Sequence, residues 1–222
     1  KNAATLASLA ETATHLQELL GIRPPLVAHD LHPDYLSTSH AEGLAGVTRV
    51  AVQHHHAHLA ACMAENGLDG EVIGVIFDGT GYGTDGAVWG CECLIASLTE
   101  FGRFGHLAYF PLAGGDRAAH EAMRPLAGLL SPQGRFDRLA EHMDMLRRVE
   151  PDANKWRLVC TQIAKGVNVV PTSSLGRLFD AAAAMCGARS APTTAPSTCW
   201  TASRRAGRTG TPRSSSIVAT AP

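Results

Sequence analysis

The sequence predicts a protein of the α/β class with a mixed sheet. Up to residue 77, short apolar segments suited to strands alternate with segments whose apolar residues recur at helical spacing. Two further strand-like segments, 87–98 and 101–110, are joined by a short link and predict an antiparallel hairpin. From residue 117 to about 186 the pattern is mostly helical.

The elements are expected in a definite order along the chain. The first helix, at 5–20, carries leucines and alanines at helical spacing and ends at Gly21, just before two prolines. After it we expect a buried strand at 26–28, a short helix at 35–43, a strand at 48–53, a helix at 54–66, and a strand at 72–77 with the β-branched pattern of a sheet centre. A glycine-rich turn at 78–83 precedes the hairpin, and breaks at 131–134, near Pro151 and at 169–172 divide the helical region.

Composition is that of an ordinary globular protein, with 222 residues and 45% hydrophobic content, enough for one large domain or two small ones. No apolar run reaches the roughly eighteen residues that span a bilayer, and no signal peptide is evident. The six cysteines form no CxxC pair, so free thiols in the reducing cytoplasm are expected. For Cys91 and Cys93, on one face of a strand, this interpretation is preferred to a metal or redox role.

Charge and composition divide the chain at about residue 188. All twenty acidic residues lie at or before Asp180, whereas 189–222 hold five arginines and no acidic residue. The acidic body gives no support for nucleic-acid binding. We therefore expect a domain at 1–187 and a tail at 188–222 that is disordered or translated out of frame, with the second explanation preferred, since no periodicity survives there. Without an initiating Met, the chain is expected to begin inside a longer protein.

A cluster of histidines, QHHHAH at 53–58, is the strongest candidate for chemistry. His54 and His58 are four residues apart, so one helix face presents both imidazoles, and a metal there needs at least one more ligand. His55 and His56 point about 100° and 200° away and are expected to contact substrate or support the ligands through hydrogen bonds. The alternative is a solvated, tag-like run, but a tag would be terminal. The HExxH pattern of metalloproteases is absent.

The second candidate is the DGTGYG segment at 78–83, which follows a core strand. Asp78 at the strand end can ligate a metal, and the glycines at Gly79 and Gly81 allow backbone amides to approach phosphate, with Thr80 bonding a phosphate oxygen. A plain hairpin turn remains an equal interpretation, and the Walker A form is excluded because no Lys follows.

The third candidate joins two motifs. One is the loop of Gly114, Gly115 and Asp116, and the other is TSSLGRLFD at 172–180, which includes Arg177 and Asp180. Each is also consistent with a plain loop and a helix capped by a serine.

Taken together, these motifs resemble the HypF family of hydrogenase-maturation carbamoyltransferases. The resemblance is carried by DLHPDYLST (30–38), QHHHAH (53–58), FDGTGYG (77–83), WG (89–90), GGD (114–116) and TSSLGRLFD (172–180), and it covers about residues 1–187. The part resembled is the carbamoyltransferase domain related to the threonylcarbamoyl-tRNA transferases. The resemblance implies a partial actin-like ATPase fold of the ribonuclease H-like kind.

The resemblance also implies a reaction and its site. Such enzymes use carbamoyl phosphate and ATP to make carbamoyl adenylate, and pass the carbamoyl group to the C-terminal cysteine thiol of the maturation protein HypE, towards the cyanide ligand of [NiFe] hydrogenase. His54, His58 and Asp78 match the catalytic metal ligands, for iron or zinc. The nucleotide is expected near Gly79, Thr80, Gly81, Gly114, Gly115, Asp116, Arg177 and Asp180.

Departures from the family limit this expectation. The family's upstream domains and the second half of its actin-like fold are absent, and the chain has Glu121-Ala122-Met123-Arg124 where the family tends to have Glu-Pro-Trp-Arg. We therefore expect a fragment that does not catalyse the full reaction alone. Two alternatives remain: an O-carbamoyltransferase of a small hydroxyl compound, and an inactive metal-binding fragment.

Overall fold

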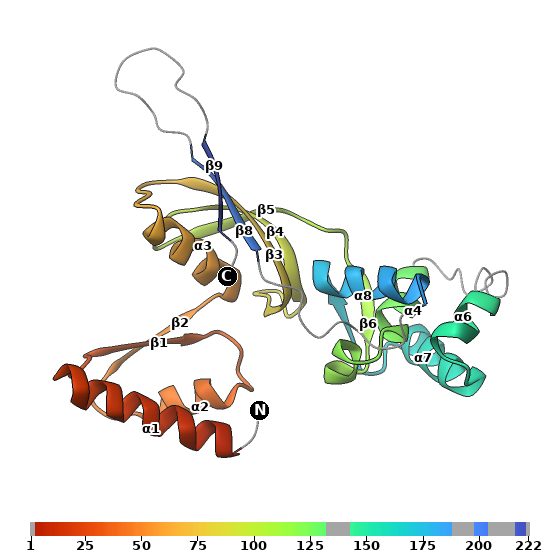
Figure 1. The fold of residues 1–222 in the computed structure, drawn as a ribbon, viewed down its shortest axis with the longest axis horizontal. Helices are drawn as coiled ribbons and strands as arrows, with labels where there is room; N and C mark the ends of the chain where they lie inside the picture. Colours follow the sequence, from red (N-terminus) through yellow and green to blue (C-terminus); the bar gives the residue numbers. More distant parts are fainter. Residues whose placement is uncertain (1–2, 132–142, 188–197, 204–215, 221–222) are drawn as a thin grey trace, which may run out of the picture. The chain divides into compact units, whose positions relative to one another are not determined.

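The computed structural model describes residues 3–131, 143–187, 198–203 and 216–220 (Figure 1). The chain divides into two compact units, residues 1–57 (unit 1) and 58–222 (unit 2). The boundary falls inside helix α3 (His54–Glu65), whose first turn belongs to unit 1 and whose remainder belongs to unit 2.

Unit 1 is built from two helices and two parallel strands. Its elements before α3 are α1 (Ala3–Leu20), β1 (Leu26–Asp30), α2 (Leu36–Gly43) and β2 (Thr48–Val52). Gly21 follows α1 with φ of 63°, the left-handed conformation common after a helix. The parallel ladder runs from Leu26 opposite Thr48 to Asp30 opposite Val52. The predicted elements of this region are thus confirmed to within a few residues.

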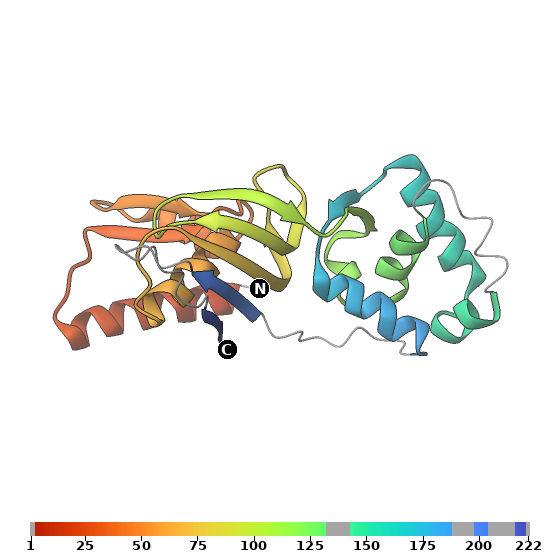
Figure 2. The ribbon, with the colours of Figure 1, turned by 90° about the horizontal axis from the view of Figure 1, so that it is seen from above.

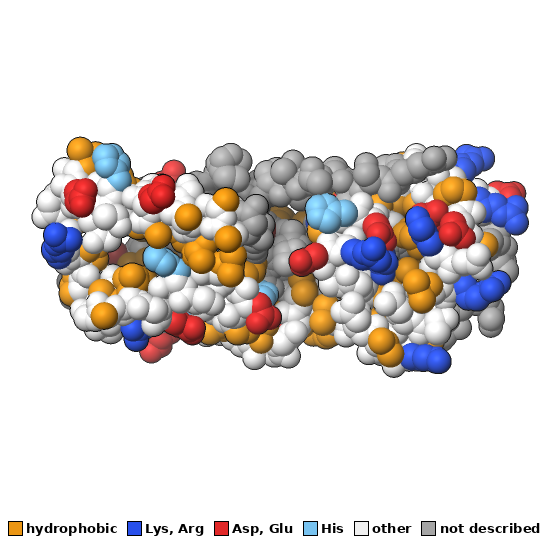
Figure 3. All heavy atoms as spheres, turned by 90° about the horizontal axis from the view of Figure 1, so that it is seen from below, with side chains coloured by type: hydrophobic (Ala, Val, Ile, Leu, Met, Phe, Trp, Pro, Cys, Tyr) orange, Lys and Arg blue, Asp and Glu red, His pale blue; other side chains and the backbone are white. Residues whose placement is uncertain are grey.

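Apolar burial is sparse in unit 1. No residue of α1 is buried, and Leu19 and Leu20 are 69% and 62% exposed. Leu26 in β1 is 50% exposed, so the prediction of a buried strand at 26–28 is wrong. Two strands alone offer too little surface to bury a strand on both faces. Figure 3 shows one face of the molecule, where hydrophobic side chains (orange) lie among charged ones.

Unit 2 begins with an antiparallel three-stranded meander. Its strands are β3 (Val72–Tyr82), β4 (Val88–Ala96) and β5 (Phe101–His106). Helix α3 covers one face through a shared core of Leu59, Cys62, Met63, Val72, Ile76, Leu94 and Ala96. The approach is close, because a Cβ on Gly74 would lie 2.6 Å from Leu59 Cδ1. Strand β3 pairs with a strand on each side, as predicted for a sheet centre.

Two predictions about this sheet are wrong. The expected glycine turn at 78–83 is instead the continuation of β3 to Tyr82, with a shift of register against β4 between Phe77 and Gly81. The expected strand at 101–110 is divided into β5 and β6 (Phe110–Ala113). The division arises because β6 pairs with β7 (Val169–Thr172), whereas β5 pairs with β4.

The helical part of unit 2 surrounds β6 and β7 (Figure 2, green to blue). It contains η1 (Gly115–Ala119), α4 (Met123–Leu130), α6 (Met143–Val149), α7 (Ala153–Lys165) and α8 (Leu175–Met185). The predicted interruption at 169–172 is confirmed and is the strand β7. Packing centres on a buried cluster that includes Ala113, Met123, Leu126, Leu146, Trp156, Val159 and Ala181.

Two strands lie inside the segment expected to be disordered or out of frame. β8 (Thr198–Ser203) pairs antiparallel with β3, and β9 (Ser216–Thr220) pairs with β8. The rest of that segment, and most of the predicted break at 131–134, lie outside the described residues. The out-of-frame origin of the tail stays a prediction. Across the described ranges, no helix combines the length and apolar character needed to cross a membrane.

Candidate metal centre

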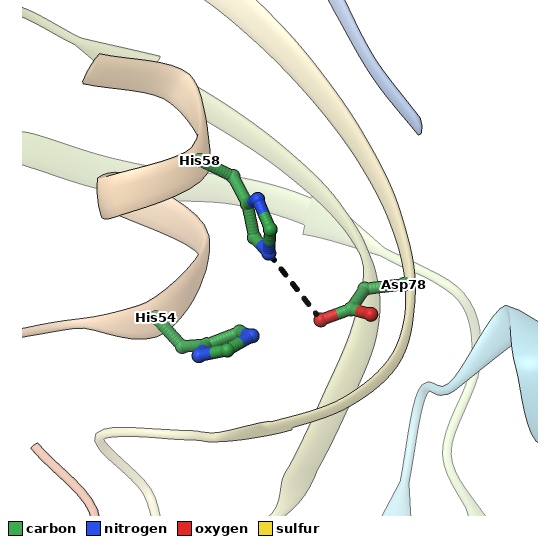
Figure 4. Close-up of side chains that lie close together, drawn as sticks. All are labelled: His54, His58 and Asp78. Atoms are coloured by element: carbon green, nitrogen blue, oxygen red, sulfur yellow. Dashed lines mark ion pairs between the residues drawn. The ribbon is translucent and has the colours of Figure 1, made fainter. Parts of the chain in front are cut away.

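The structure brings His54, His58 and Asp78 together, as the sequence predicts (Figure 4). Each offers one ligand atom, and these atoms lie within 4.8 Å of one another. Helix α3 presents both imidazoles on one face, and the extension of β3 carries Asp78 towards them, with 3.8 Å between His58 Nε2 and Asp78 Oδ2. All three residues are half-buried, so the group is partly screened from water while remaining accessible.

Asp30 orients His54. Its Oδ2 lies 2.7 Å from His54 Nδ1, and its Oδ1 accepts a hydrogen bond of 2.8 Å from the backbone N–H of His32. A carboxylate on Nδ1 keeps the proton there and makes Nε2 the nitrogen that can act as a ligand, as in many histidine metal sites. Asp30 was not predicted to belong to the site, although its place in the DLHP motif, at the end of β1, was the available signal.

The two central histidines of the cluster are buried. His55 is fully buried and His56 is 7% exposed. The side chain of Gln53 accepts a hydrogen bond from the backbone N–H of His56 at 2.9 Å, and its Nε2 lies 3.2 Å from His55 Nδ1. Burial favours the hydrogen-bonding role considered for these residues over the substrate contact.

Asp78 is held by its own neighbour. Its Oδ1 accepts a hydrogen bond of 2.6 Å from the Gly79 backbone N–H, while its Oδ2 faces His58. Gly79, Thr80 and Gly81 lie in extended backbone, and a phosphate-binding nest requires a turn-like alternation of conformations. A phosphate role for these three residues therefore stays a prediction without support from nest geometry.

The Gly-Gly-Asp loop has the backbone conformation that its glycines suggest. Gly114 and Gly115 have φ of 100° and 55°, and Asp116 is exposed. A Cβ on Gly114 would clash with the guanidinium of Arg124, which is 5% exposed and pairs with Glu121 at 2.6 Å. Glu121 and Arg124, the two residues that this chain shares with the Glu-Pro-Trp-Arg pattern of the family, thus form the support beneath this loop.

Arg177 and Asp180 lie in the protein interior. They form an ion pair of 3.0 Å on α8, and Arg177 also donates to the Ala118 carbonyl at 3.3 Å. Burial raises the pKa of Asp180, and the positive charge of Arg177 opposes that rise. In this arrangement the pair ties α8 to η1, and a direct nucleotide contact stays a prediction.

Comparison with known proteins identifies the class of protein to which this chain belongs. Residues 74–194 match the model of the carbamoyltransferase Kae1-like domain, second subdomain, and residues 1–65 match that of the HypF Kae1-like domain. The match across both segments defines a Kae1-like carbamoyltransferase domain. The chain belongs to the HypF family of carbamoyltransferases.

Individual relatives agree with this assignment. Carbamoyltransferase HypF2 of Cupriavidus necator is 48% identical over 191 residues, covering 85% of this chain and 23% of the relative. Carbamoyltransferase HypF of Rhizobium leguminosarum bv. viciae is 39% identical over 188 residues, covering 85% of this chain and 24% of the relative. The chain therefore spans about a quarter of the length of these relatives.

A solved structure confirms the fold. Full-length HypF in a phosphate- and nucleotide-bound form is matched with a TM-score of 0.77 and 40% identity, over 84% of this chain and 24% of that one. The predicted α/β class with helices and a mixed sheet is thus confirmed.

Proposed function

We propose that this chain forms the metal-binding and part of the nucleotide-binding region of an ATP-dependent carbamoyltransferase that acts in [NiFe] hydrogenase maturation. The observation that carries the proposal is the convergence of His54, His58 and Asp78 within 4.8 Å. Membership of the HypF family supplies the reaction class.

The donor set fits a divalent metal ion. Two imidazoles and one carboxylate are typical ligands of zinc and of non-haem iron, and three protein ligands leave positions for substrate oxygens. The Asp30 carboxylate on His54 Nδ1 is the support that such ligands commonly have. When bound, such an ion would supply Lewis-acid polarisation of the carbamoyl carbonyl and offset phosphate charge.

The nucleotide is proposed to lie near the two glycine segments. The solved relative is full-length HypF in a phosphate- and nucleotide-bound form, which supports nucleotide binding by members of this family. Here Gly115, in left-handed conformation, can present its backbone amide to an anion, while Gly114 is proposed to shape the loop, since its own N–H donates to the Asn168 carbonyl at 2.9 Å. Gly79, Thr80, Gly81 and Asp116 are proposed to line the same region, and Arg177 and Asp180 to support it from within.

The proposed reaction needs no nucleophile from this chain. Water cleaves carbamoyl phosphate to carbamate and inorganic phosphate, and a carbamate oxygen attacks the α-phosphorus of ATP, which forms carbamoyl adenylate and releases pyrophosphate. The thiolate of the C-terminal cysteine of HypE then attacks the carbamoyl carbon. The carbon–sulfur bond forms, the bond from carbon to the phosphate oxygen of AMP breaks, and AMP leaves. The residues of this chain bind and orient the adenylate.

Metal analysis of the purified chain is the direct test of this proposal. The unchanged protein is expected to retain about one equivalent of iron or zinc, and His58→Ala is expected to lose most of it because two ligands hold a metal far less tightly than three. His15→Ala, at an exposed position on α1, is the matched control and should retain the metal. Equal metal content in all three proteins would contradict the site.

Transfer activity separates the remaining alternatives. Because this chain is not expected to complete the reaction alone, its residues 1–187 replace the matching segment of a full-length relative, and that protein is incubated with ATP, carbamoyl phosphate and HypE. Thiocarbamate on the HypE C-terminal cysteine, measured by mass spectrometry, is the expected product. Label on a small hydroxyl acceptor instead would indicate the O-carbamoyltransferase alternative. Bound metal with no transfer to any acceptor would indicate a metal-binding fragment.

A further inference from the structure

A buried carboxylate in unit 2 lies outside the candidate metal centre. Glu92 on β4 is fully buried, and each of its oxygens is engaged. Oε1 accepts from the backbone N–H groups of Gly90 and Cys91 at 3.0 and 3.2 Å, and from the hydroxyl of Ser173 at 2.5 Å. Oε2 accepts from Arg103 Nε at 2.6 Å.

Arg103 extends this contact to several other elements. Its Nη1 donates to Tyr109 at 2.6 Å and to Asp85 at 3.2 Å, and its Nη2 lies 3.4 Å from the Ser173 hydroxyl. The guanidinium also stacks on Trp89, 3.9 Å from the ring centroid. The Glu92–Arg103 pair thus joins β4 and β5 to the segment between β7 and α8.

Stability alone does not account for such a pair. Removing two charges from water is costly, and replacing a buried ion pair by apolar side chains is often neutral or stabilising. A buried pair with every hydrogen bond satisfied can instead specify one geometry of the backbone around it. The backbone segments that contact the Glu92–Arg103 pair are therefore the ones that it can fix.

The backbone beside Ser173 touches the glycine segment of β3. Ser174 donates its hydroxyl hydrogen to the Gly79 carbonyl at 2.6 Å and accepts from the Arg177 N–H at 3.0 Å, which caps α8. A Cβ on Gly176 would lie 2.8 Å from the Gly79 Cα. Because no side chain separates these backbones, a displacement of the 173–174 corner must displace Gly79.

We propose that Glu92 and Arg103 are positioning residues, which hold Ser173 and Ser174 and thereby fix the Gly79 backbone for nucleotide binding. This inference rests on the nucleotide site proposed above. It adds two side chains that act on the site through the 173–174 corner without touching the nucleotide.

Two measurements on the full 222-residue chain, with the affinity for a metal ion as a reference, test the inference. In Glu92→Gln, the guanidinium loses the nearer of its two charged partners and the Ser173 hydroxyl loses a charged acceptor, so the dissociation constant for ATP is expected to rise about tenfold. Hydrogen exchange of the amides at 79–81 and 173–178 is expected to become faster. The affinity for Co²⁺, a probe of His54, His58 and Asp78, should stay within about twofold, a separation that general loosening of the fold would not give.

Ser173→Ala provides a smaller change that leaves the ion pair intact. It is expected to raise the ATP dissociation constant about threefold, and to add little when combined with Glu92→Gln because both act through one contact. Glu150→Gln, which removes an ion pair with Lys155 on the surface of the same unit, is the matched control and should change neither measurement.

Each outcome bears on the inference. If Glu92→Gln does not fold, as judged by tryptophan fluorescence, Ser173→Ala decides alone. Unchanged ATP affinity and exchange in the variants would overturn the positioning role, as would equal loss of ATP and Co²⁺ binding. If the unchanged chain binds no ATP, the proposed nucleotide function fails, and the exchange rates at 79–81 still decide whether Glu92 fixes that backbone.

Discussion

Units 1 and 2 differ in how many of their side chains they bury. In unit 1, helix α1 has no buried residue, and Leu26 in the two-stranded sheet is half exposed. In unit 2, two apolar clusters form around β3 to β5 and around β6, β7 and their helices, and a fully buried carboxylate is satisfied on every side. Unit 2 can fix side chains by packing, whereas unit 1 relies mainly on backbone ladders and local hydrogen bonds.

The residues of the candidate metal centre stand on parts of the chain that differ in burial. Asp30 orients His54 from the sparsely buried unit, through one short hydrogen bond. Asp78 lies on β3. The two residues just before it, Ile76 and Phe77, pair with β4 on one side and with β8 on the other. We therefore expect substitutions in unit 2 to have large effects on stability and equivalent ones in unit 1 to have small effects.

The largest difference is expected for core leucines. Leu126→Ala removes a fully buried side chain from the cluster of α4 and should lower the free energy of unfolding by about 3 kcal/mol. Leu19→Ala, at a position that is 69% exposed on α1, should change it by less than about 0.5 kcal/mol. Urea unfolding followed by far-UV circular dichroism measures this difference, because helices of both units contribute to that signal, whereas all three tryptophans lie in unit 2 and report on that unit alone. A similar loss of unfolding free energy in both variants would contradict the expected difference between the two units.

Replacing a glycine by alanine should have opposite effects on stability in the two units, with a magnitude between those of the other predictions. A Cβ on Gly90 would lie 2.5 Å from the Asp78 carbonyl oxygen and 2.8 Å from Ser174 Cα, so Gly90→Ala should cost about 2 kcal/mol. Gly43, the last residue of α2, has no atom within 4 Å of such a Cβ, and Gly43→Ala should stabilise the helix by about 0.5 kcal/mol. Thermal melting of both variants tests the pair, and a tolerated Gly90→Ala would show that β4 can move away from α8.

The smallest effect concerns the pH dependence of unit 2. Burial alone raises the pKa of Asp85, but hydrogen bonds from Tyr109, Ala87 and Trp89 and the charge of Arg103 outweigh it, so the pKa lies below its usual value. A lowered pKa stabilises the folded state above the unfolded value of about 3.9 and ceases to do so as the pH falls through the folded value. Because the side chain is 42% exposed, the expected contribution at pH 7 is no more than about 0.5 kcal/mol.

Unfolding of Asp85→Asn between pH 7 and pH 3 checks this sign. The variant should be slightly less stable than the unchanged chain at pH 7, and the two should converge at the acid end. Asp69→Asn, at an exposed position before β3, is the control. A difference that grows as the pH falls would contradict the assignment.

Periodicity and ligand spacing carried most of what the sequence predicted correctly. The helices at 3–20 and 54–65 follow from apolar spacing, and the pair His54 and His58 follows from helical geometry alone. The glycine segment was mispredicted because glycine marks both a turn and a close approach of backbones, and only the pairing of β3 with β4 distinguishes them. Burial of Arg177 and Asp180 was not foreseen, since an ion pair three residues apart has the same spacing on a solvated surface.

The contacts of Gly90 and Gly176 also restrict how this gene can change. Each glycine faces backbone atoms, and since glycine is the smallest residue, every mutation there adds atoms with no smaller neighbour available to compensate. We therefore expect every substitution at these two codons to be disfavoured for as long as the strands and α8 stay in contact. In a set of orthologues, a replacement at either codon would mark lineages in which the contact between these elements has been lost.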